Sequence, residues 1–572
     1  MKYFRRLIIL FILIIVGIVI ISRDIPSRLM GEASGSLQVY YNIKKADEIN
    51  SKAILIYIDD NQLNIQNPAP YMEETMELML PVQSASQIFQ CDVQMDEDDS
   101  VYFIKNDIVI CLSESDDFYS LSKGEIDGNR VEFEGGMTVQ EGQFFVAASI
   151  LSLAFHYEYI WEDDTNSALF TVTEAADLSE LPSAYDMRDD NRVTAIRNQG
   201  TLGTCWAFAS LSALESTLMP EEELIFAADH LSLSNGFGIS QNDGGDYNMA
   251  MAYLASWKGP VLEADDPYGD NKTDESLTAV KHLQEAINIE EKDYQKIKQM
   301  IYTYGGVQSS FYSDMETADS SSKYYNMATQ SYYYVGDQSA NHDIVIIGWD
   351  DNYSKENFNN EPENDGAFLC RNSWGDNFGD GGYFYISYED TNIGVNNIVY
   401  TVIEDSDNYD NIYQSDLLGW IGSIGYQEEY AYFSNVYQAS DEEYLKSAAF
   451  YATGSDTYYD VYVVRNFTDT SSYSDIEYMM SGYLEDAGYY TIDFRKVIKL
   501  DEESQFAVVV RIRTTEAIHP IAIEYNEGEL ITQADISDGQ GYISYDGVQW
   551  EQVESTYNCN LCLKAFTDII DK

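Results

Sequence analysis

The stretch that decides the fold of this chain runs Gln199-Gly-Thr-Leu-Gly-Thr-Cys205-Trp206. It places a cysteine directly before a tryptophan, six residues after a glutamine, at the start of a run that favours a helix (residues 207–216). Much later come Asn341-His342 with an apolar run after them, and then Asn372-Ser-Trp374-Gly. A thiol acyl-transfer enzyme needs a nucleophile, a base and a group that orients the base. The three segments offer one of each.

These motifs, in this order, resemble the papain family of cysteine proteases over residues 181–402. Leu181-Pro-Ser-Ala-Tyr-Asp-Met-Arg188 resembles the usual start of the mature enzyme, and Asp266-Pro267-Tyr268 resembles a further landmark of the family. The spacing between the cysteine, histidine and asparagine motifs matches the family loosely. The resemblance implies an α+β fold of two lobes, the first mainly helical and the second rich in strands, with a cleft between them.

Each motif residue has a role in such an enzyme. Cys205 is the expected nucleophile, because the positive end of a helix and an imidazolium at His342 would both lower the pKa of its thiol. His342 is the expected general base and acid. The resemblance implies that Asn372 orients the imidazole ring, and that Gln199 donates a side-chain N–H to an oxyanion hole beside the backbone N–H of Cys205.

Four further residues are expected around this group. Trp374 would shield the contact between the histidine and the asparagine from water, and Trp206 would lie in the same second layer. Gly244 and Gly245 stand where the family has a glycine pair that lines the substrate cleft. Glycine there lets the backbone of an extended substrate approach closely. No metal and no cofactor is expected.

The same residues have purely structural interpretations, which single motifs leave open. Cys205 could be a buried cysteine and His342 a structural histidine at the start of a strand. Asn372 could be a turn residue, Gln199 a solvated loop residue, and Gly244-Gly245 a plain turn. The combination of the motifs favours the catalytic interpretation of each residue.

The cysteines are few, and their pattern departs from the family at one point. The family usually has a disulfide-bonded cysteine three residues before the nucleophile, where this chain has Leu202. We therefore expect packing to hold this wall of the cleft. Cys91 and Cys111 could pair, and Cys370 is expected to be buried in a strand. The lone Cys559-Asn-Leu-Cys562 lacks the second pair or the histidines of a zinc site.

The charge of the chain excludes one class of partner. With 97 acidic and 32 basic residues the formal net charge is −65, which argues against a nucleic-acid partner. The acidic residues are spread along the chain, as in a solvated exterior. Residues 405–410 (Asp-Ser-Asp-Asn-Tyr-Asp) could bind calcium, although the ordered ligand pattern of a known loop is missing.

The amino terminus predicts export. Residues 1–6 are basic, and residues 7–21 are all apolar or glycine, which together form a signal peptide or membrane anchor over residues 1–22. No small-x-small cleavage site follows closely, so an uncleaved anchor is expected to tether an extracellular protein. The protein would be secreted if the segment were cleaved. The basic end would stay inside.

Two accessory modules flank the protease region (residues 181–402). After a linker (residues 23–50), residues 51–175 resemble the small α+β domain named after the amino terminus of copper amine oxidases, with a weak repeat of helix-like stretches at residues 80–89 and 144–153. Residues 408–570 alternate as in an antiparallel β-sandwich and resemble a bacterial lectin-like domain. A cell-surface glycan is a possible ligand of this sandwich.

The sequence thus predicts an exported papain-type endopeptidase that hydrolyses peptide bonds of protein or peptide substrates through a thioester on Cys205. Two alternatives remain open. The papain fold could be catalytically weak or inactive in a surface adhesin that acts through its sandwich. A thiol-redox protein that uses Cys559 and Cys562 is the other alternative.

Overall fold

The structure is a computed structural model of the 572-residue chain. It describes residues 49–570 with gaps, the longest of which are residues 73–77, 113–117, 121–129 and 173–180. The contacts divide the chain into two compact units: residues up to Gln90 with residues 137–151 and 159–171 form one, and residues 91–136, 152–158 and 172 onwards form the other. No helix among the described residues is long and apolar enough to span a membrane. The predicted signal or anchor (residues 1–22) lies outside them.

The predicted repeat at the amino-terminal end is present as two similar successions of elements. The first runs β4 (Leu78–Pro81), α3 (Val82–Phe89), β5 (Asp92–Met95) and β6 (Val101–Lys105), and the second runs β11 (Gln143–Ala147), α4 (Ala148–Ala154), β12 (Tyr157–Glu162) and β13 (Ser167–Val172). Both helices begin later than expected, because Leu80–Pro81 and Phe144–Ala147 belong to strands. The helix-like patterns therefore start inside the strands that precede them.

The remaining strands of this region are short. They are β1 (Leu55–Ile58), β2 (Asn61–Leu63), β3 (Tyr71–Met72), β7 (Ile108–Leu112), β8 (Phe118–Ser120), β9 (Arg130–Glu132) and β10 (Met137–Gln140). They form sheets in the orders β12-β13-β1-β2, β10-β11-β4-β3, β5-β6-β7 and β8-β9. The possible pairing of Cys91 with Cys111 is wrong, since neither residue forms a disulfide. Cys91 directly precedes β5, Cys111 lies in β7, and β6 separates these strands, so the two residues are too far apart for a disulfide.

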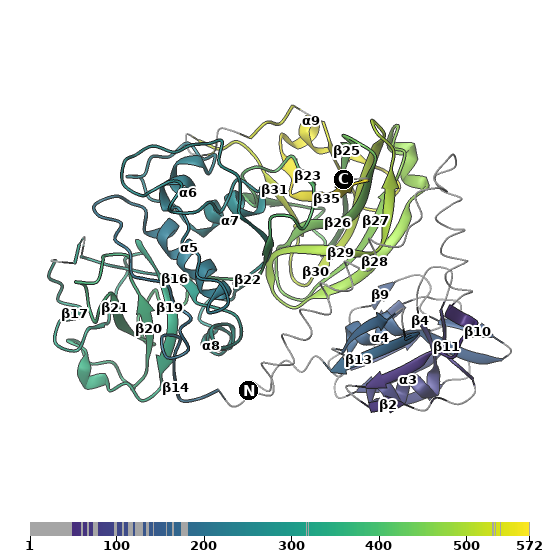
Figure 1. Ribbon diagram of the computed structural model, residues 1–572, viewed down its shortest axis with the longest axis horizontal. Helices are drawn as coiled ribbons and strands as arrows, with labels where there is room; N and C mark the ends of the chain where they lie inside the picture. Colours follow the sequence, from purple (N-terminus) through teal and green to yellow (C-terminus); the bar gives the residue numbers. More distant parts are fainter. Residues whose placement is uncertain are drawn as a thin grey trace. The chain divides into compact units, whose positions relative to one another are not determined.

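The protease region has the two expected lobes (Figure 1). The helical lobe contains α5 (Cys205–Leu218), α6 (Ala228–Ser234) and α7 (Tyr247–Ala255). Every residue of α5 from Trp206 to Ser216 is buried, Glu215 included, so this helix lies inside the core. The other lobe consists mainly of antiparallel strands, with α8 (Tyr294–Thr303) packed against β16 (Val307–Phe311) and β19 (His342–Asp350).

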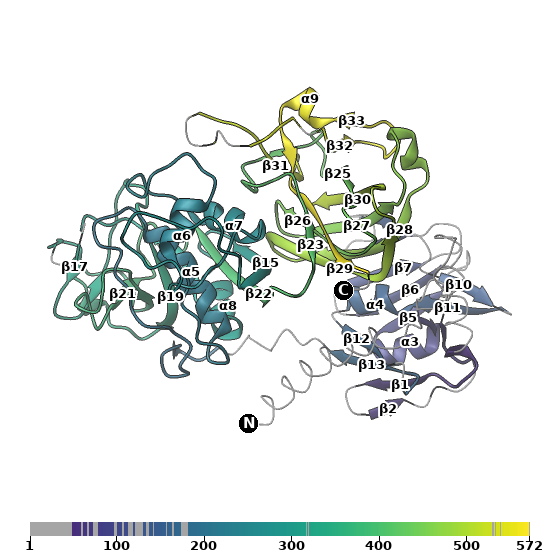
Figure 2. The same cartoon turned by 45° about the horizontal axis from the view of Figure 1, so that its top comes forward.

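One long sheet runs through the protease region and into the sandwich. Its order is β17 (Tyr325–Asn326), β18 (Ser331–Tyr332), β21 (Tyr383–Ser387), β20 (Ala367–Arg371), β19 (His342–Asp350), β16 (Val307–Phe311), β22 (Asn397–Asp405), β15 (Lys281–Ile289), β29 (Ala487–Leu500), β26 (Glu443–Ala452), β35 (Leu563–Ile569) and β23 (Asn411–Tyr413), and β14 (Ala184–Asp186) pairs with β19. Figure 2 shows the junction, where β15 and β22 lie next to β26 and β29.

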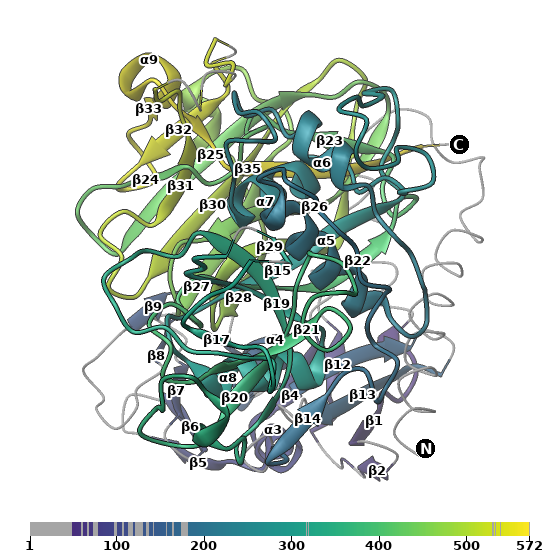
Figure 3. The same ribbon diagram turned by 90° about the vertical axis from the view of Figure 1, so that its left-hand side faces the viewer.

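The carboxy-terminal strands form the predicted antiparallel sandwich (Figure 3). A sheet in the order β28 (Glu477–Leu484), β27 (Thr457–Val464), β30 (Gln505–Thr514), β25 (Tyr430–Gln438), β32 (Gly541–Ser544) and β33 (Glu551–Gln552) is opposed by strands β29, β26, β35 and β23 of the long sheet. A smaller sheet holds β24 (Gly422–Ile424), β31 (Ile521–Glu524) and β34 (Asn560–Leu561), and α9 (Val553–Tyr557) lies close by.

A single hydrophobic core joins the protease region to the sandwich. It extends from Trp206 and Ile346 in the protease region to Leu445 and Phe566 in the sandwich. At the junction, Trp257 stacks on His282 at 3.8 Å between ring centroids and on Phe566 at 5.5 Å. The sandwich is therefore packed onto the protease region through a continuous sheet and a shared core.

Candidate active site

The nucleophile candidate stands at a helix start, as the sequence predicts. Cys205 is the first residue of α5 and is partly exposed, whereas the other five cysteines, all in the described part of the chain, are buried. The side chain of Thr204, the residue before the helix, does not cap the helix. Thr204 therefore offers no side-chain acceptor to the first backbone N–H groups of α5. These groups lie at the end of the helix that carries the sulfur, where they can bind a developing anion.

The imidazole and the amide candidates are in direct contact. His342 begins β19, and Asn372 directly follows β20, the strand that pairs with β19. Nε2 of His342 lies 2.8 Å from Oδ1 of Asn372. The ring of Trp374 lies 4.7 Å from the imidazole ring, centroid to centroid, and both residues are buried. Trp374 therefore packs over the contact between the imidazole and the amide.

The hydrogen bonds around Asn372 fix the tautomer of the imidazole. The backbone N–H of Ser373 also donates to Oδ1 of Asn372, at 2.8 Å. Because an N–H can only donate, this atom is the amide oxygen and cannot be the amide nitrogen of a flipped side chain. Nε2 of His342 must therefore carry the proton that it donates to Oδ1. Nδ1 is left as the basic nitrogen.

The start of β19, where His342 stands, lies close to Cys205. The backbone N–H of Asp343, the residue after His342, points at the sulfur of Cys205 and lowers the pKa of the thiol. Helix α5 packs on β19 over its length. The structure thus places the start of α5 against the start of β19, although the two residues come from different lobes.

Gln199 is held in a fixed orientation next to the nucleophile. Its Oε1 accepts a hydrogen bond from the hydroxyl of Ser373 at 2.6 Å, and its Nε2 donates to the carbonyl of Leu202 at 2.8 Å. An amide nitrogen has two N–H bonds, so one remains to donate to a substrate. The backbone N–H of Gln199 donates to the carbonyl of Ser373 at 2.8 Å, which ties the helical lobe to the strand lobe.

The glycine pair and Trp206 lie together. A Cβ atom on Gly245 would come within 2.5 Å of the indole of Trp206, so only glycine fits there. Gly244 has a φ of +86°, a conformation that glycine adopts without strain. The backbone N–H of Gly203 donates to the carbonyl of Gln241 at 2.7 Å. This backbone bond joins the two loops beside Leu202, where packing alone was expected.

Burial opposes an isolated charge on Cys205 or on His342. Burial, and to a smaller extent the charge of Asp343, raises the pKa of the Cys205 thiol to about 12, against the lowering that the helix start predicts. Burial lowers the pKa of His342 to about 4, and its bond to Asn372 opposes this shift. Because burial disfavours a lone charge on either residue, a proton that moves from the thiol to the imidazole creates two opposite charges that stabilise each other.

Two functional residues were missed by the sequence analysis. Tyr268, noted only as part of a family landmark, donates its hydroxyl proton to the backbone carbonyl of Gln199 at 2.8 Å and lies 2.7 Å from the hydroxyl of Thr204. It thereby joins both ends of the loop that carries the nucleophile. Asp343 lies next to the thiol. A carboxylate directly after the histidine, in an otherwise apolar run, was the signal that could have revealed it.

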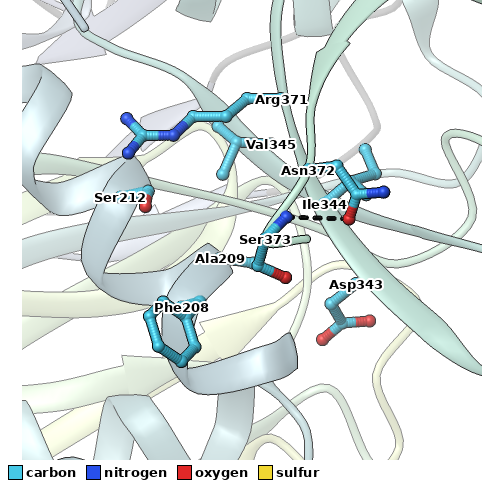
Figure 4. Close-up of a pocket in the computed structure, with 9 residues that line it drawn as sticks. All are labelled: Phe208, Ala209, Ser212, Asp343, Ile344, Val345, Arg371, Asn372 and Ser373. Atoms are coloured by element: carbon cyan, nitrogen blue, oxygen red, sulfur yellow. Dashed lines mark hydrogen bonds between the residues drawn. The ribbon is translucent and has the colours of Figure 1, made fainter. Parts of the chain in front are cut away.

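A small cavity lies where the lobes meet. Figure 4 shows its lining: Phe208, Ala209 and Ser212 of α5, Asp343, Ile344 and Val345 of β19, and Arg371, Asn372 and Ser373 at the end of β20. Arg371 is buried and donates to Thr194 and to the carbonyl of Ala195, so it fastens the strand lobe to the segment before the nucleophile. The catalytic candidates thus stand on elements that are anchored on both sides.

The alternative metal and redox sites find little support. Among the described residues, no group of three or more His, Cys, Asp or Glu side chains is arranged to hold a metal ion. Asp405 is 2.6 Å from the ammonium of Lys281, and Asp410 accepts the backbone N–H of Ile569. Cys559 and Cys562 are free and buried, and burial raises the pKa of both thiols, which disfavours redox exchange.

Comparisons with known proteins follow the same division of the chain. Residues 181–403 match the family described as papain family cysteine protease, and residues 412–567 match the family described as lectin like domain. Both matches begin after residue 180, so the resemblance of residues 51–175 to the copper amine oxidase module stays a prediction.

Curated relatives share the protease region. A viral cathepsin of Heliothis zea nuclear polyhedrosis virus is 27% identical over 220 residues, which cover 38% of this chain and 55% of the cathepsin. Ananain of Ananas comosus is 27% identical over 214 residues, which cover 37% of this chain and 57% of ananain. The chain therefore spans little more than half the length of these two relatives.

Solved structures share both carboxy-terminal parts. The cysteine protease and lectin-like domains of Cwp84, a surface layer associated protein of Clostridium difficile, are 25% identical with a TM-score of 0.60, over 68% of this chain and 90% of that one. A second structure of the clostridial protease Cwp84, after propeptide cleavage, is 26% identical with a TM-score of 0.61, over 68% of this chain and 99% of that one. The pairing of a protease region with a sandwich is common to all three.

Proposed function

We propose that this chain is an exported cysteine endopeptidase, because residues 181–403 match the papain family of cysteine proteases and residues 412–567 match the lectin-like domain family. It hydrolyses peptide bonds of protein or peptide substrates through a thioester on Cys205. One observation carries the proposal: Asn372 holds the proton of His342 on Nε2 and leaves Nδ1 as the base, on a strand whose start lies against the sulfur.

The first half of the reaction forms the thioester. Nδ1 of His342 takes the thiol proton of Cys205, and the sulfur attacks the carbonyl carbon of the substrate. The charge that develops on the carbonyl oxygen is met by the free N–H of Gln199 and by the backbone N–H of Cys205. The C–N bond then breaks as the imidazolium gives its proton to the leaving amine.

The second half releases the acid. Nδ1 takes a proton from water, and the resulting hydroxide attacks the thioester carbon in the same oxyanion site. The C–S bond breaks, the sulfur recovers the proton from the imidazolium, and a carboxylic acid leaves. Asn372 accepts the Nε2 proton throughout, so the ring keeps one orientation in both halves.

The proposed location rests on the sequence and on a relative. The apolar segment at residues 7–21 would tether the protein to the membrane, with the protease outside. The similar protein Cwp84 is described as surface layer associated. We infer the same side of the membrane for this chain. A glycan of the cell surface is the ligand class that we propose for the lectin-like domain.

The test is stoichiometric alkylation of the full chain by an epoxide inhibitor of thiol proteases. We expect one label, on Cys205, and much slower labelling of His342→Ala, together with hydrolysis of a casein substrate that Cys205→Ala does not perform. A wild-type protein that stays unlabelled in reducing buffer and cleaves nothing would favour the inactive adhesin. Labelling at Cys559 or Cys562 would favour the redox alternative.

A further inference from the structure

The candidate active site contains a carboxylate that takes no part in the proposed reaction. Asp343 follows His342 in β19 and pairs in register with Ser310 of β16. Ser310 donates its hydroxyl to Oδ1 of Asp343 at 2.7 Å, and Nε2 of Gln308 donates to Oδ2 at 3.0 Å.

This carboxylate faces the helix that carries the nucleophile. Oε1 of Gln308 accepts the hydroxyl proton of Ser210, a residue of α5, at 2.7 Å. The chain of bonds from α5 through Gln308 to Asp343 fixes the carboxylate from two strands and a helix. Its charge reaches the sulfur of Cys205, whose pKa it raises. Asp343 is therefore near enough to act on a substrate bound at the thiol.

A second carboxylate approaches from the glycine pair. Asp246 follows Gly245 and caps α7, where its Oδ1 accepts the backbone N–H of Asn248 at 2.9 Å. Burial is the main cause that raises the pKa of Asp343 and of the phenol of Tyr247, and the charge of Asp246 adds to both shifts. Asp246 follows Gly245, which lies against Trp206, and Asp343 lines the small cavity with Asn372. The two carboxylates thus border the candidate active site from two different elements, next to the glycines along which an extended substrate is expected to lie.

No cation of the described chain lies within salt-bridge distance of Asp343 or Asp246. Asp343 is half-buried and Asp246 is exposed, so both carboxylates remain within reach of a ligand. Carboxylates that have no cation beside them leave a negative potential in a cleft, and this potential attracts a positively charged ligand. The cation that a protease cleft meets is a substrate side chain.

We propose that Asp343 and Asp246 select a lysine or arginine side chain of the substrate, which they hold beside Cys205. The inference rests on the proposed function and adds a substrate class to it. The basic side chain lies between the carboxylate from the strand lobe and the one from the helical lobe, on the side of the thiol that the glycine pair borders. The selection is electrostatic, so it separates basic side chains from neutral ones of the same length.

The test compares lysine with norleucine, its neutral counterpart, at each of the three positions before the scissile bond of a fluorogenic peptide. For the full chain we expect kcat/KM to be at least about 10-fold higher with lysine at one position. Asp343→Asn and Asp246→Asn should each lower this ratio several-fold. Asparagine caps a helix as well as aspartate does, so the second variant removes only charge.

Asp243→Asn is the matched control, because Asp243 is an exposed carboxylate of the same loop that bonds to Ser240. It should leave the ratio unchanged. Equal rates for lysine and norleucine at all three positions, or a preference that persists in both variants, would overturn the inference while hydrolysis itself supports the proposed function. If the wild-type protein hydrolyses no peptide and is not alkylated, the proposed function fails and the inference fails with it.

Discussion

The hydroxyl of Tyr268 donates to the main-chain carbonyl of Gln199 and lies within hydrogen-bond distance of Thr204, so one side chain ties together both ends of the nucleophile loop. The ring also packs edge-on against Phe208 of α5, at 4.7 Å between centroids. The loop between Gln199 and Cys205 is thereby closed against the helix that it begins. The position of the oxyanion donors relative to the sulfur depends on this closure.

Tyr268→Phe removes the two hydroxyl contacts and keeps the ring. We expect the free energy of unfolding to fall by about 1 kcal/mol and kcat to fall with little change in KM. Urea unfolding and steady-state kinetics measure both quantities. Tyr353→Phe, which removes a hydroxyl bond to the carbonyl of Thr329, is the control and should lower stability without lowering kcat. Equal kcat in the two variants would show that Tyr268 has no positioning role.

Gln199→Ala removes an oxyanion donor. We expect kcat to fall roughly 100- to 1,000-fold, while an epoxide inhibitor still labels Cys205. Since the substitution also deletes the bond from the hydroxyl of Ser373, Ser373→Ala serves as the control that removes this bond alone. The assignment fails if Ser373→Ala costs as much activity as Gln199→Ala.

Asn372 sets the tautomer of the base, which predicts different effects for two substitutions. Asn372→Ala leaves the imidazole free to turn and to change tautomer, so kcat should fall about 10- to 100-fold. Asn372→Asp keeps an acceptor for both Nε2–H of His342 and the backbone N–H of Ser373, so it should retain more activity than alanine. Its negative charge should also raise the pKa of His342 in the pH profile of kcat/KM. Identical kinetics of the two variants would contradict this role.

The pH dependence of selectivity follows from Asp343. Burial, and to a smaller extent Asp246, raises the pKa of its carboxyl to about 6, against bonds from Ser310 and Gln308 that lower it. A carboxyl is charged above its pKa, so the ratio of kcat/KM for lysine over norleucine should rise between pH 5 and pH 7. The titratable groups that face it are Cys205, Asp246, Tyr247 and Tyr400, and the use of a ratio cancels their effects on the reaction itself. In Asp343→Asn this rise of the ratio should disappear. If the ratio still rises with pH in that variant, another group causes the pH dependence.

Truncation tests the junction of the protease region with the sandwich. A fragment of residues 181–405 loses β29, which pairs with β15 from Asn288 to Glu285, and loses Phe566, which packs on Trp257. An exposed strand edge and an uncovered core favour aggregation. We expect this fragment to aggregate or to melt at a lower temperature than residues 181–570, as measured by size-exclusion chromatography and calorimetry. A monomeric fragment with an unchanged Tm would show that the domains are independent.

Local patterns predicted the position of the catalytic candidates well. The start of α5 at Cys205, the start of β19 at His342 and the end of β20 before Asn372 all follow from short runs of sequence. In each case the motif residue stands at one end of its run: Cys205 and His342 are the first residues of their elements, and Asn372 directly follows its strand. Such signals need no knowledge of the partner element.

Other features depend on which distant segments meet. The charge of Asp343 acts on Cys205 only because β19 packs on α5, so the raised pKa of the thiol was not predictable from the helix start. The pairing of residues 285–288 with residues 487–490 joins strands that are about 200 positions apart, and neither strand signals its partner. The thiols of Cys91 and Cys111 stay apart because a third strand lies between theirs.

The seam between β15 and β29 has a mechanical consequence. A hinge needs a segment whose backbone can change its dihedral angles, and hydrogen bonds across a sheet together with the stacked rings of Trp257 and His282 deny that freedom at this joint. The protease region and the sandwich accordingly move as one rigid body. If the sandwich binds to a surface, its attachment also fixes the direction in which the candidate active site faces. Attachment would then decide which neighbouring chains the active site can reach.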